Sequence, residues 1–86
     1  MYRVILQSQP RQFFADADRP LARKLAHGFR TLEQTPRRHP NIKALSGTLA
    51  GHFRFRAGDY RIIYLVDEAA SQVQVVRIAH RSEAYR

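Results

Sequence analysis

The stretch Phe53-Arg54-Phe55-Arg56-Ala57-Gly58-Asp59-Tyr60-Arg61-Ile62-Ile63-Tyr64 decides the fold, because two alternating segments flank a central glycine. Gly58 followed by Asp59 is typical of a two-residue type II′ hairpin turn. That turn fixes the register, so Arg56 is expected directly opposite Arg61. The apolar face of the hairpin then consists of Phe53, Phe55, Ile62 and Tyr64. The other face consists of His52, Arg54, Arg56, Arg61 and Ile63.

The facing arginines are the first indication of a function. Like charges directly opposite one another destabilise an antiparallel ladder unless an anion or a carboxylate lies over them. Arg56 and Arg61 therefore favour a face that binds a polyanion, and a local conflict of this kind is typical of functional sites. Two structural alternatives remain open. The side chains splay into water, or they are neutralised by a carboxylate of Asp59, Asp67 or Glu83.

Strand patterns occur on both sides of the hairpin. Residues 2–7 alternate in polarity, and residues 51–56, 60–66 and 72–80 are rich in aromatic and β-branched side chains. Simple alternation divides the last run into two faces, which are Val73, Val75, Arg77 and Ala79 on one side and Gln74, Val76, Ile78 and His80 on the other. Both faces are apolar enough for a central strand.

Two helices are expected before the hairpin. Ser8 is a candidate cap and Pro10 suits a first turn, so residues 9–17 form a short helix. Asp18 caps a second helix, whose apolar side chains recur at helical spacing at Leu21, Leu25, Phe29 and Leu32. Its other side carries Arg23, Lys24, His27, Arg30 and Glu33 and is expected to face solvent.

These elements predict an α+β fold in one domain, residues 1–86. Residues 35–50 contain two prolines and several small polar residues, which indicates a loop. The expected order is β-α-α-β-β-β, with the two N-terminal helices packed on one face of a four-stranded, mainly antiparallel, twisted sheet. A chain of 86 residues leaves no room for a second domain.

The charge balance indicates a polyanionic partner. The chain has a net charge of +8, from 15 Lys and Arg against 7 Asp and Glu, and only Lys24 and Lys43 are lysines. A guanidinium binds phosphate bidentately, so an arginine-rich surface favours RNA. A solvated basic surface reflecting codon usage is the alternative. Cysteine is absent, and the N-terminal apolar run is too short for a signal peptide or a membrane span, so we expect a cytoplasmic protein without membrane association.

The chain resembles the RelE/ParE superfamily of bacterial toxins, the toxin halves of type II toxin–antitoxin modules. The resemblance rests on three segments, taken with the expected order of elements: Leu45-Ser46-Gly47, the stretch from Phe53 to Tyr64, and Arg77-Ile78-Ala79-His80-Arg81-Ser82-Glu83-Ala84-Tyr85. It implies a ribonuclease that cuts mRNA in the ribosomal A site without a metal or cofactor. It also implies a cognate antitoxin protein and a toxin–antitoxin hetero-oligomer.

The resemblance also implies roles for individual residues. Arg61 matches an arginine that contacts the scissile phosphate, Arg81 matches the basic residue after the last strand, and Tyr85 matches a tyrosine that orients the RNA. Arg54 and Arg56 fall where some relatives have catalytic lysines, and we expect them to bind RNA. Arginine stays protonated and is a poor general base.

The general base is therefore sought among the histidines, which titrate near neutral pH. His80 is the expected catalytic residue. His52 is a second candidate and an expected RNA-binding residue, with Glu83 behind both. A lone histidine on a strand is more often structural. No metal-binding spacing of His, Cys, Asp or Glu and no glycine-rich phosphate loop occurs in the sequence.

Two other functions remain open. A ParE-like protein of the same fold inhibits DNA gyrase, and fold alone does not decide between the two activities. A basic RNA-binding module with weak or no catalysis is the third possibility, because the expected lysines are absent from positions 54 and 56. Among these we expect a ribosome-dependent mRNA endoribonuclease that inhibits translation.

Overall fold

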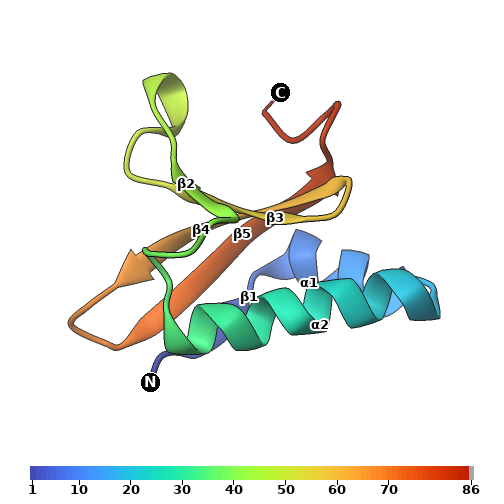
Figure 1. Cartoon of the computed structure of the whole chain (residues 1–86), viewed down its shortest axis with the longest axis horizontal. Helices are drawn as coiled ribbons and strands as arrows, with labels where there is room; N and C mark the ends of the chain where they lie inside the picture. The colour runs from blue at the N-terminus through green and yellow to red at the C-terminus, as the bar shows by residue number, and fades with distance from the viewer. Residues whose placement is uncertain (86) are drawn as a thin grey trace.

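The computed structural model describes residues 1–85, which form two helices on one side of a five-stranded sheet (Figure 1). The elements in chain order are β1 (Arg3–Leu6), α1 (Ser8–Asp16), α2 (Arg19–Gln34), β2 (Ile42–Ala44), the 3-10 turn η1 (Gly47–Leu49), β3 (Phe53–Ala57), β4 (Tyr60–Asp67) and β5 (Gln72–His80). The strands lie in the order β1-β5-β4-β3-β2, with β1 parallel to β5 and the other pairs antiparallel. The α+β class and the helices on one face are confirmed. The number of strands is five, not four.

The β3–β4 hairpin has the predicted register. Arg56 pairs with Arg61 and Ala57 with Tyr60. Gly58 has a φ of 62°, which L-residues rarely adopt, while Asp59 is not among the positive-φ residues. That combination excludes a type I′ turn, which needs positive φ at both positions, and agrees with type II′.

The additional strand lies within the predicted loop. β2 has only three residues, Ile42-Lys43-Ala44, and so short an alternation does not by itself indicate a strand. Its partner β3 imposes the extended conformation, since Ile42 pairs with Phe55. The pairing is extended at both ends, where the Arg56 amide donates to the Asn41 carbonyl at 2.8 Å and the Leu45 amide donates to the His52 carbonyl at 2.9 Å.

A β-bulge in β5 overturns the expected division of its two faces. Ile63 pairs with Arg77 and Tyr64 with Val75, so Val76 is the extra residue. After the bulge the alternation is shifted by one residue, and Val73, Val75 and Ile78 all enter the core beneath the helices. His80 then follows Ile78 onto the helix face, while Arg77 and Ala79 are left on the opposite face.

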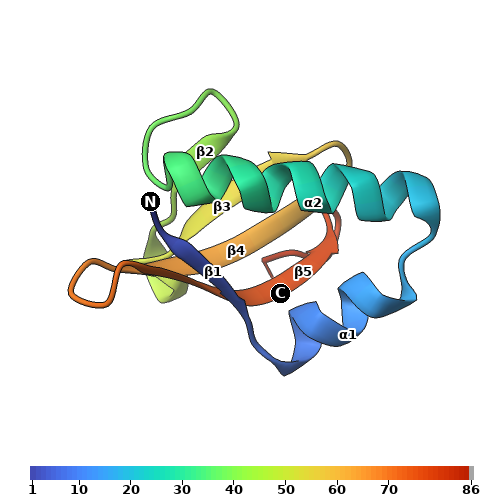
Figure 2. The ribbon, with the colours of Figure 1, turned by 90° about the horizontal axis from the view of Figure 1, so that it is seen from below.

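The helices cover the apolar face of the sheet (Figure 2). Asp18 caps α2 as expected, accepting a hydrogen bond from the Leu21 amide at 3.0 Å. Ser8 is the first residue of α1 and makes no side-chain cap. The fully buried core between the layers consists of Leu25, Leu32, Phe55, Ile62, Tyr64, Val73, Val75 and Ile78.

Gly28 lets α2 approach the sheet closely. A Cβ atom at this position would lie 3.0 Å from Ile62 Cδ1 and 3.1 Å from Phe55 Cε1. Both neighbours are buried core side chains with little freedom to move. The close contact therefore depends on the absence of a side chain at Gly28.

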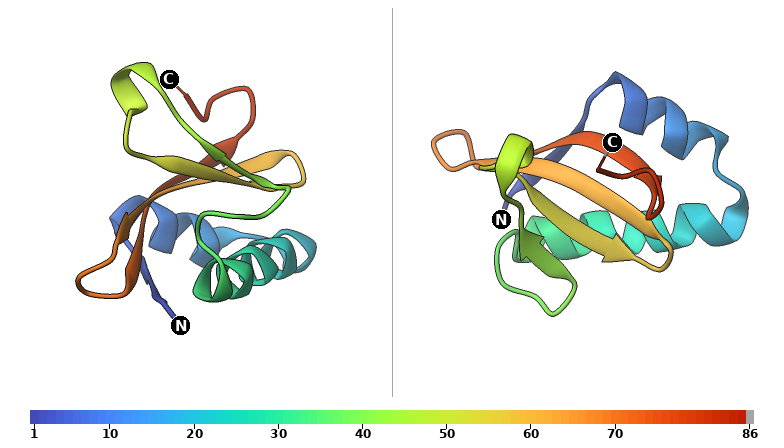
Figure 3. Two further views of the ribbon diagram at one scale, coloured as in Figure 1. Left: turned by 60° about the vertical axis from the view of Figure 1, so that its left-hand side comes forward. Right: turned by 90° about the horizontal axis from the view of Figure 1, so that it is seen from above.

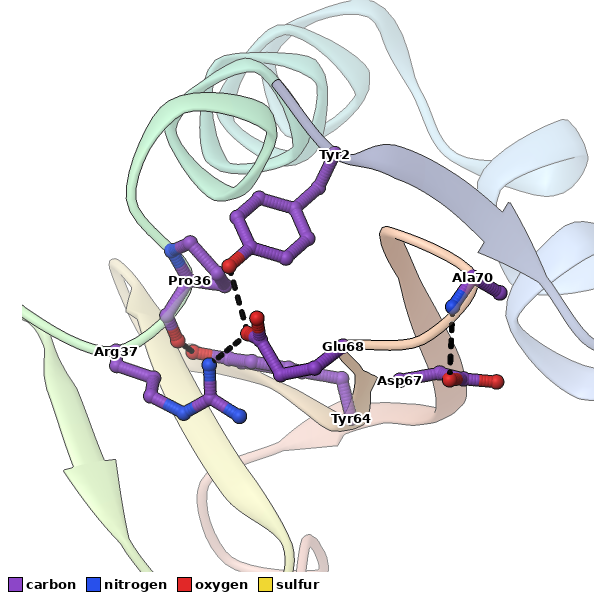
Figure 4. A network of polar contacts seen from close by, with 7 residues as sticks. All are labelled: Tyr2, Pro36, Arg37, Tyr64, Asp67, Glu68 and Ala70. Carbon is purple, nitrogen blue, oxygen red and sulfur yellow. Dashed lines mark hydrogen bonds and ion pairs between the residues drawn. The ribbon is translucent and has the colours of Figure 1, made fainter.

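A polar network joins β1, the segment after α2, and the β4–β5 turn (Figure 4). The Tyr2 hydroxyl donates to Glu68 Oε1 at 2.6 Å, and Arg37 forms an ion pair with the same carboxylate. These contacts lower the pKa of Glu68, the Tyr2 hydrogen bond having the larger effect. Nearby, the buried Tyr64 hydroxyl donates to the Pro36 carbonyl at 2.7 Å, and burial raises the pKa of this phenol. The network thus links the N-terminal segment to the segment after α2 and to the β4–β5 turn, at the end of the sheet where the N-terminus lies.

Candidate functional site

An open pocket lies on the face of the sheet that the helices leave uncovered. The 3-10 turn η1 and the C-terminal tail rise above this face (Figure 3). The pocket between them has a volume of about 540 Å³. Its charged and aromatic lining residues are Lys43, Arg54, Arg61, Arg81 and Tyr85. The loop from Ala44 to Leu49 completes the wall.

The hairpin supplies two of the arginines, and backbone carbonyls hold both in place. Arg54 donates from a terminal nitrogen to the Asn41 carbonyl at 2.7 Å. Arg61 donates to the carbonyls of Gly58 and Tyr60, each at 3.0 Å. Each guanidinium therefore has one nitrogen anchored on a backbone carbonyl, and further N–H groups remain to bind an anion.

Arg56 lies outside the pocket although it is paired with Arg61. Its side chain is exposed, whereas Arg61 is half-buried and hydrogen-bonded to the carbonyls of the turn. Neither arginine forms an ion pair with Asp59, Asp67 or Glu83 in the described chain, which leaves the alternative in which the pair is solvated and not neutralised by a carboxylate. Arg56 stays a predicted RNA-binding residue at the rim of the hairpin.

The C-terminal tail brings Arg81 and Tyr85 to the pocket. The Arg81 amide donates to the Asp59 carbonyl at 2.8 Å, which fixes the start of the tail on the hairpin turn. Further along, Arg77 donates to the Glu83 carbonyl at 3.1 Å. Ala84 is 1% exposed and packs with Ile63 and Ala79. Tyr85 is left 50% exposed at the pocket, with its ring available for stacking.

Lys43 is a pocket residue that sequence reasoning missed. It lies on β2 directly opposite Arg54, and both side chains line the pocket. The missed strand explains the missed residue, because a lysine in a loop has no defined neighbour. The apolar-polar-apolar order of Ile42-Lys43-Ala44 was the available signal, but three residues do not reveal a register.

The pocket is strongly electropositive. Neither Asp nor Glu lines it, and across residues 1–85 the observed ion pair is Arg37 with Glu68, which belongs to the polar network described above. The four pocket cations therefore lack a carboxylate partner in the described chain. Residues 1–85 also contain no group of three or more His, Asp or Glu side chains placed to hold a metal ion, and none of their helices is long and apolar enough to cross a membrane.

Comparison with known proteins decides the family. The family model of the ParE toxin of the type II toxin–antitoxin system parDE matches residues 4–85. The chain belongs to the RelE/ParE superfamily. The toxin is 41% identical over 44 residues to "Toxin RelE" of Mycobacterium tuberculosis, a stretch covering 51% of this chain and 45% of that protein. The match therefore spans about half of each protein.

Solved structures give the same fold over nearly the whole toxin. The RelBE2 toxin–antitoxin complex of Mycobacterium tuberculosis superposes with a TM-score of 0.79 at 26% identity, covering 93% of this chain and 98% of that one. The archaeal RelE–RelB complex of Pyrococcus horikoshii OT3 superposes with a TM-score of 0.80 at 26% identity, covering 96% and 98%.

The two candidate histidines of the toxin lie outside the pocket lining. The His80 ring packs edge-on against Tyr60, with ring centroids 5.5 Å apart, and its Nδ1 lies 2.9 Å from Ser82 Oγ. The β5 bulge directs this ring to the helix face. His52 Nδ1 lies 3.2 Å from the Leu49 carbonyl. The structure thus brings together Arg54, Arg61, Arg81 and Tyr85 and leaves His80, His52 and Arg56 outside the pocket lining.

Proposed function

We propose that this toxin is a metal-independent, ribosome-dependent mRNA endoribonuclease that inhibits translation. The observation that carries the proposal is the pocket itself, in which four cations without carboxylate partners and one half-exposed tyrosine converge. Cations suit the phosphate, and an aromatic ring suits a base lifted out of its stack. The 41% identity to "Toxin RelE" over 44 residues supports the assignment.

In the proposed reaction the 2′-hydroxyl oxygen attacks the adjacent phosphorus and the bond to the 5′-oxygen breaks. Negative charge develops on the phosphoryl oxygens, and in our scheme Arg61, anchored on the carbonyls of Gly58 and Tyr60, and Arg81 stabilise it. Arg54 holds the neighbouring phosphate. Tyr85 stacks on a base and so fixes the RNA strand in the pocket.

Lys43 takes the proposed role in proton transfer. It is the one lysine among the four pocket cations, and the other three are arginines, which stay charged and are poor proton donors. In our scheme its ammonium group donates a proton to the departing 5′-oxygen, while the 2′-hydroxyl proton passes to water. His80 remains the competing prediction, and substitution of each residue separates the two.

The decisive experiment incubates purified toxin with programmed ribosomes in EDTA and maps the new mRNA 5′ ends. Wild-type toxin is expected to cut the message at the A site. Arg61→Gln and Arg81→Gln are each expected to lower the cleavage rate by about 100-fold or more, the usual cost of losing one group that stabilises developing charge. Arg11→Gln, an exposed cation of α1 outside the pocket, is the matched control. If the message stays intact when wild-type toxin and programmed ribosomes are present in equal amounts, the proposal is wrong.

Inhibition of DNA gyrase is the second candidate, favoured by the match of residues 4–85 to the ParE toxin model. A supercoiling assay that responds to the toxin, and responds equally to Arg61→Ala, supports this function. A non-catalytic basic RNA-binding module is the third candidate. Growth arrest upon induction of the wild-type toxin, abolished by Arg61→Ala, contradicts it.

We also propose a cognate antitoxin and a cytoplasmic location. The compared structures are complexes of RelE-type toxins with their antitoxins, and a nuclease acting on ribosomes works in the cytoplasm. A net charge of +8 favours an acidic, amphipathic antitoxin segment that orders on binding and forms a hetero-oligomer. Co-expression with the neighbouring open reading frame, followed by co-purification, tests the pairing.

A further inference from the structure

A second basic surface lies on α2, on the opposite side of the sheet from the pocket. We call it the basic stripe, and it consists of Arg19, Arg23, His27 and Arg30, all exposed. Their spacing of four, four and three residues places them along one line of the helix, about 16 Å from first to last at 1.5 Å per residue. The buried residues of α2, Leu25, Gly28 and Leu32, face the other way. Figure 2 shows the outer side of α2 with no other element over it.

The stripe is not explained by the stability of the helix. Within the described chain, none of its members takes part in an ion pair. Like charges four residues apart, as at Arg19 and Arg23, destabilise a helix. The α2 helix is already held by its Asp18 cap and its buried apolar side. The three arginines of the stripe thus stand without a carboxylate partner in the described chain, at some cost to the helix.

The chemistry of the stripe favours a phosphate backbone over a protein partner. Stable protein interfaces need large apolar or aromatic anchors and are depleted of charge at their centre. Across residues 1–85 the exposed large hydrophobic side chains are Met1, Leu65 and Tyr85, and none of them lies on α2. Backbone recognition of a nucleic acid, in contrast, requires only cations.

The side chains of the stripe also favour double-helical RNA over single-stranded RNA. Proteins that hold single-stranded RNA combine cations with aromatic side chains on which bases stack. The pocket offers the large Tyr85 ring for that purpose, whereas the stripe offers no Phe, Tyr or Trp and only the small imidazole of His27. Double-helical RNA is recognised through its shape, phosphates and 2′-hydroxyls without base stacking. A straight row of cations meets several phosphates of a duplex at once.

We propose that the basic stripe of α2 binds the phosphate backbone of double-helical RNA. The domain then lies between two RNA segments, with a single strand in the pocket on one side of the sheet and a duplex along α2 on the other. A folded RNA with single-stranded and double-helical segments close together satisfies both surfaces. The inference requires no cleavage activity, and its failure leaves the proposed nuclease function intact.

The test measures binding of a blunt 20-base-pair RNA duplex to the full-length protein over a range of salt concentrations. The stripe variant is Arg23→Gln with Arg30→Gln. The control variant is Arg3→Gln with Arg11→Gln, which also removes two positive charges, but from exposed positions on β1 and α1. Thermal melts of all three proteins confirm that these surface changes leave the fold intact.

The stripe variant is expected to bind the duplex about tenfold more weakly at 0.1 M salt, if each arginine contributes as an exposed ion pair does. Its slope of log affinity against log salt should fall by about 1.8, from about 0.9 per lost phosphate contact. The control should change either quantity much less. An equal loss in both variants means that net charge alone attracts the duplex and overturns the proposal.

Two further outcomes are informative. A single-stranded 12-mer should bind the stripe variant as it binds wild type, because the pocket is unchanged. A stripe variant that binds the duplex normally but no longer binds the co-expressed antitoxin assigns α2 to a protein partner, and this also overturns the proposal.

Discussion

Docking of the C-terminal tail should be separable from folding of the domain, and Ala84→Asp tests this. Ala84 is 1% exposed and packs with Ile63 and Ala79. Burying a carboxylate there costs several kcal/mol. The contacts that hold the docked tail contribute a comparable gross amount, about 1 kcal/mol for each of three hydrogen bonds and about 0.8 kcal/mol for the alanine methyl, and the conformational entropy lost by the docked residues offsets part of it. The tail is therefore expected to release, carrying Arg81 and Tyr85 out of the pocket.

The three hydrogen bonds are Arg81 N–H to the Asp59 carbonyl, Glu83 N–H to the His80 carbonyl, and Arg77 to the Glu83 carbonyl. Release limits the loss of stability, because the freed residues regain conformational entropy. We expect a loss of about 1–3 kcal/mol, which in a domain of this size lowers Tm by roughly 5–15 °C. Loss of two pocket groups should lower cleavage by at least about 100-fold.

The assay combines mRNA cleavage on programmed ribosomes, a thermal melt, and amide hydrogen exchange of residues 81–85. Ala69→Asp is the matched control, because it makes the same change at an exposed position in the β4–β5 turn. Fast exchange of the tail in a folded, inactive variant agrees with the reasoning. An Ala84→Asp protein with a protected tail and wild-type cleavage refutes it.

Three further predictions concern the site and the polar network. Lys43→Gln should lower the cleavage rate by about 100-fold, typical of a lost general acid, whereas His80→Gln should leave it within a fewfold of wild type; the reverse result reinstates His80. Tyr64→Phe removes a buried hydrogen bond and should lower the free energy of unfolding by about 1–2 kcal/mol at pH 7 in chemical denaturation. Because burial raises the pKa of Tyr64, wild type should lose stability above about pH 10, where the unfolded tyrosine ionises, and the phenylalanine variant should lose less. The contacts of Glu68 with Tyr2 and Arg37 lower the pKa of this carboxyl group. Wild type should therefore have a higher Tm than Glu68→Gln above about pH 4.5, and this difference should disappear as the pH falls further. A difference in Tm that persists at pH 2 contradicts the prediction.

Sequence reasoning succeeded where local chemistry specifies conformation. The Gly58-Asp59 turn set the register that pairs Arg56 with Arg61, and the Asp18 cap marked the start of α2. It failed at β2, because three residues beside a sheet edge become a strand only through their partner β3. It failed again in β5, where a bulge at Val76 interrupts the alternation on which the assignment of faces depended.

The same distinction applies to the candidate site. Arg54, Arg61, Arg81 and Tyr85 were predicted one by one, and the structure places all four around one pocket. Lys43 was missed. His80 stays a predicted catalytic residue, although its ring packs on Tyr60 and it does not line the pocket.

The amino-acid sequence by itself determined the fold class, the hairpin and its arginine face, because turn chemistry, capping and hydrophobic period act between residues close in the chain. Only the tertiary structure decided which cations share a pocket and that both candidate histidines lie outside its lining. A single bulge or a three-residue edge strand changes those neighbours, and both arise from pairing with segments distant in the sequence, which no local pattern records.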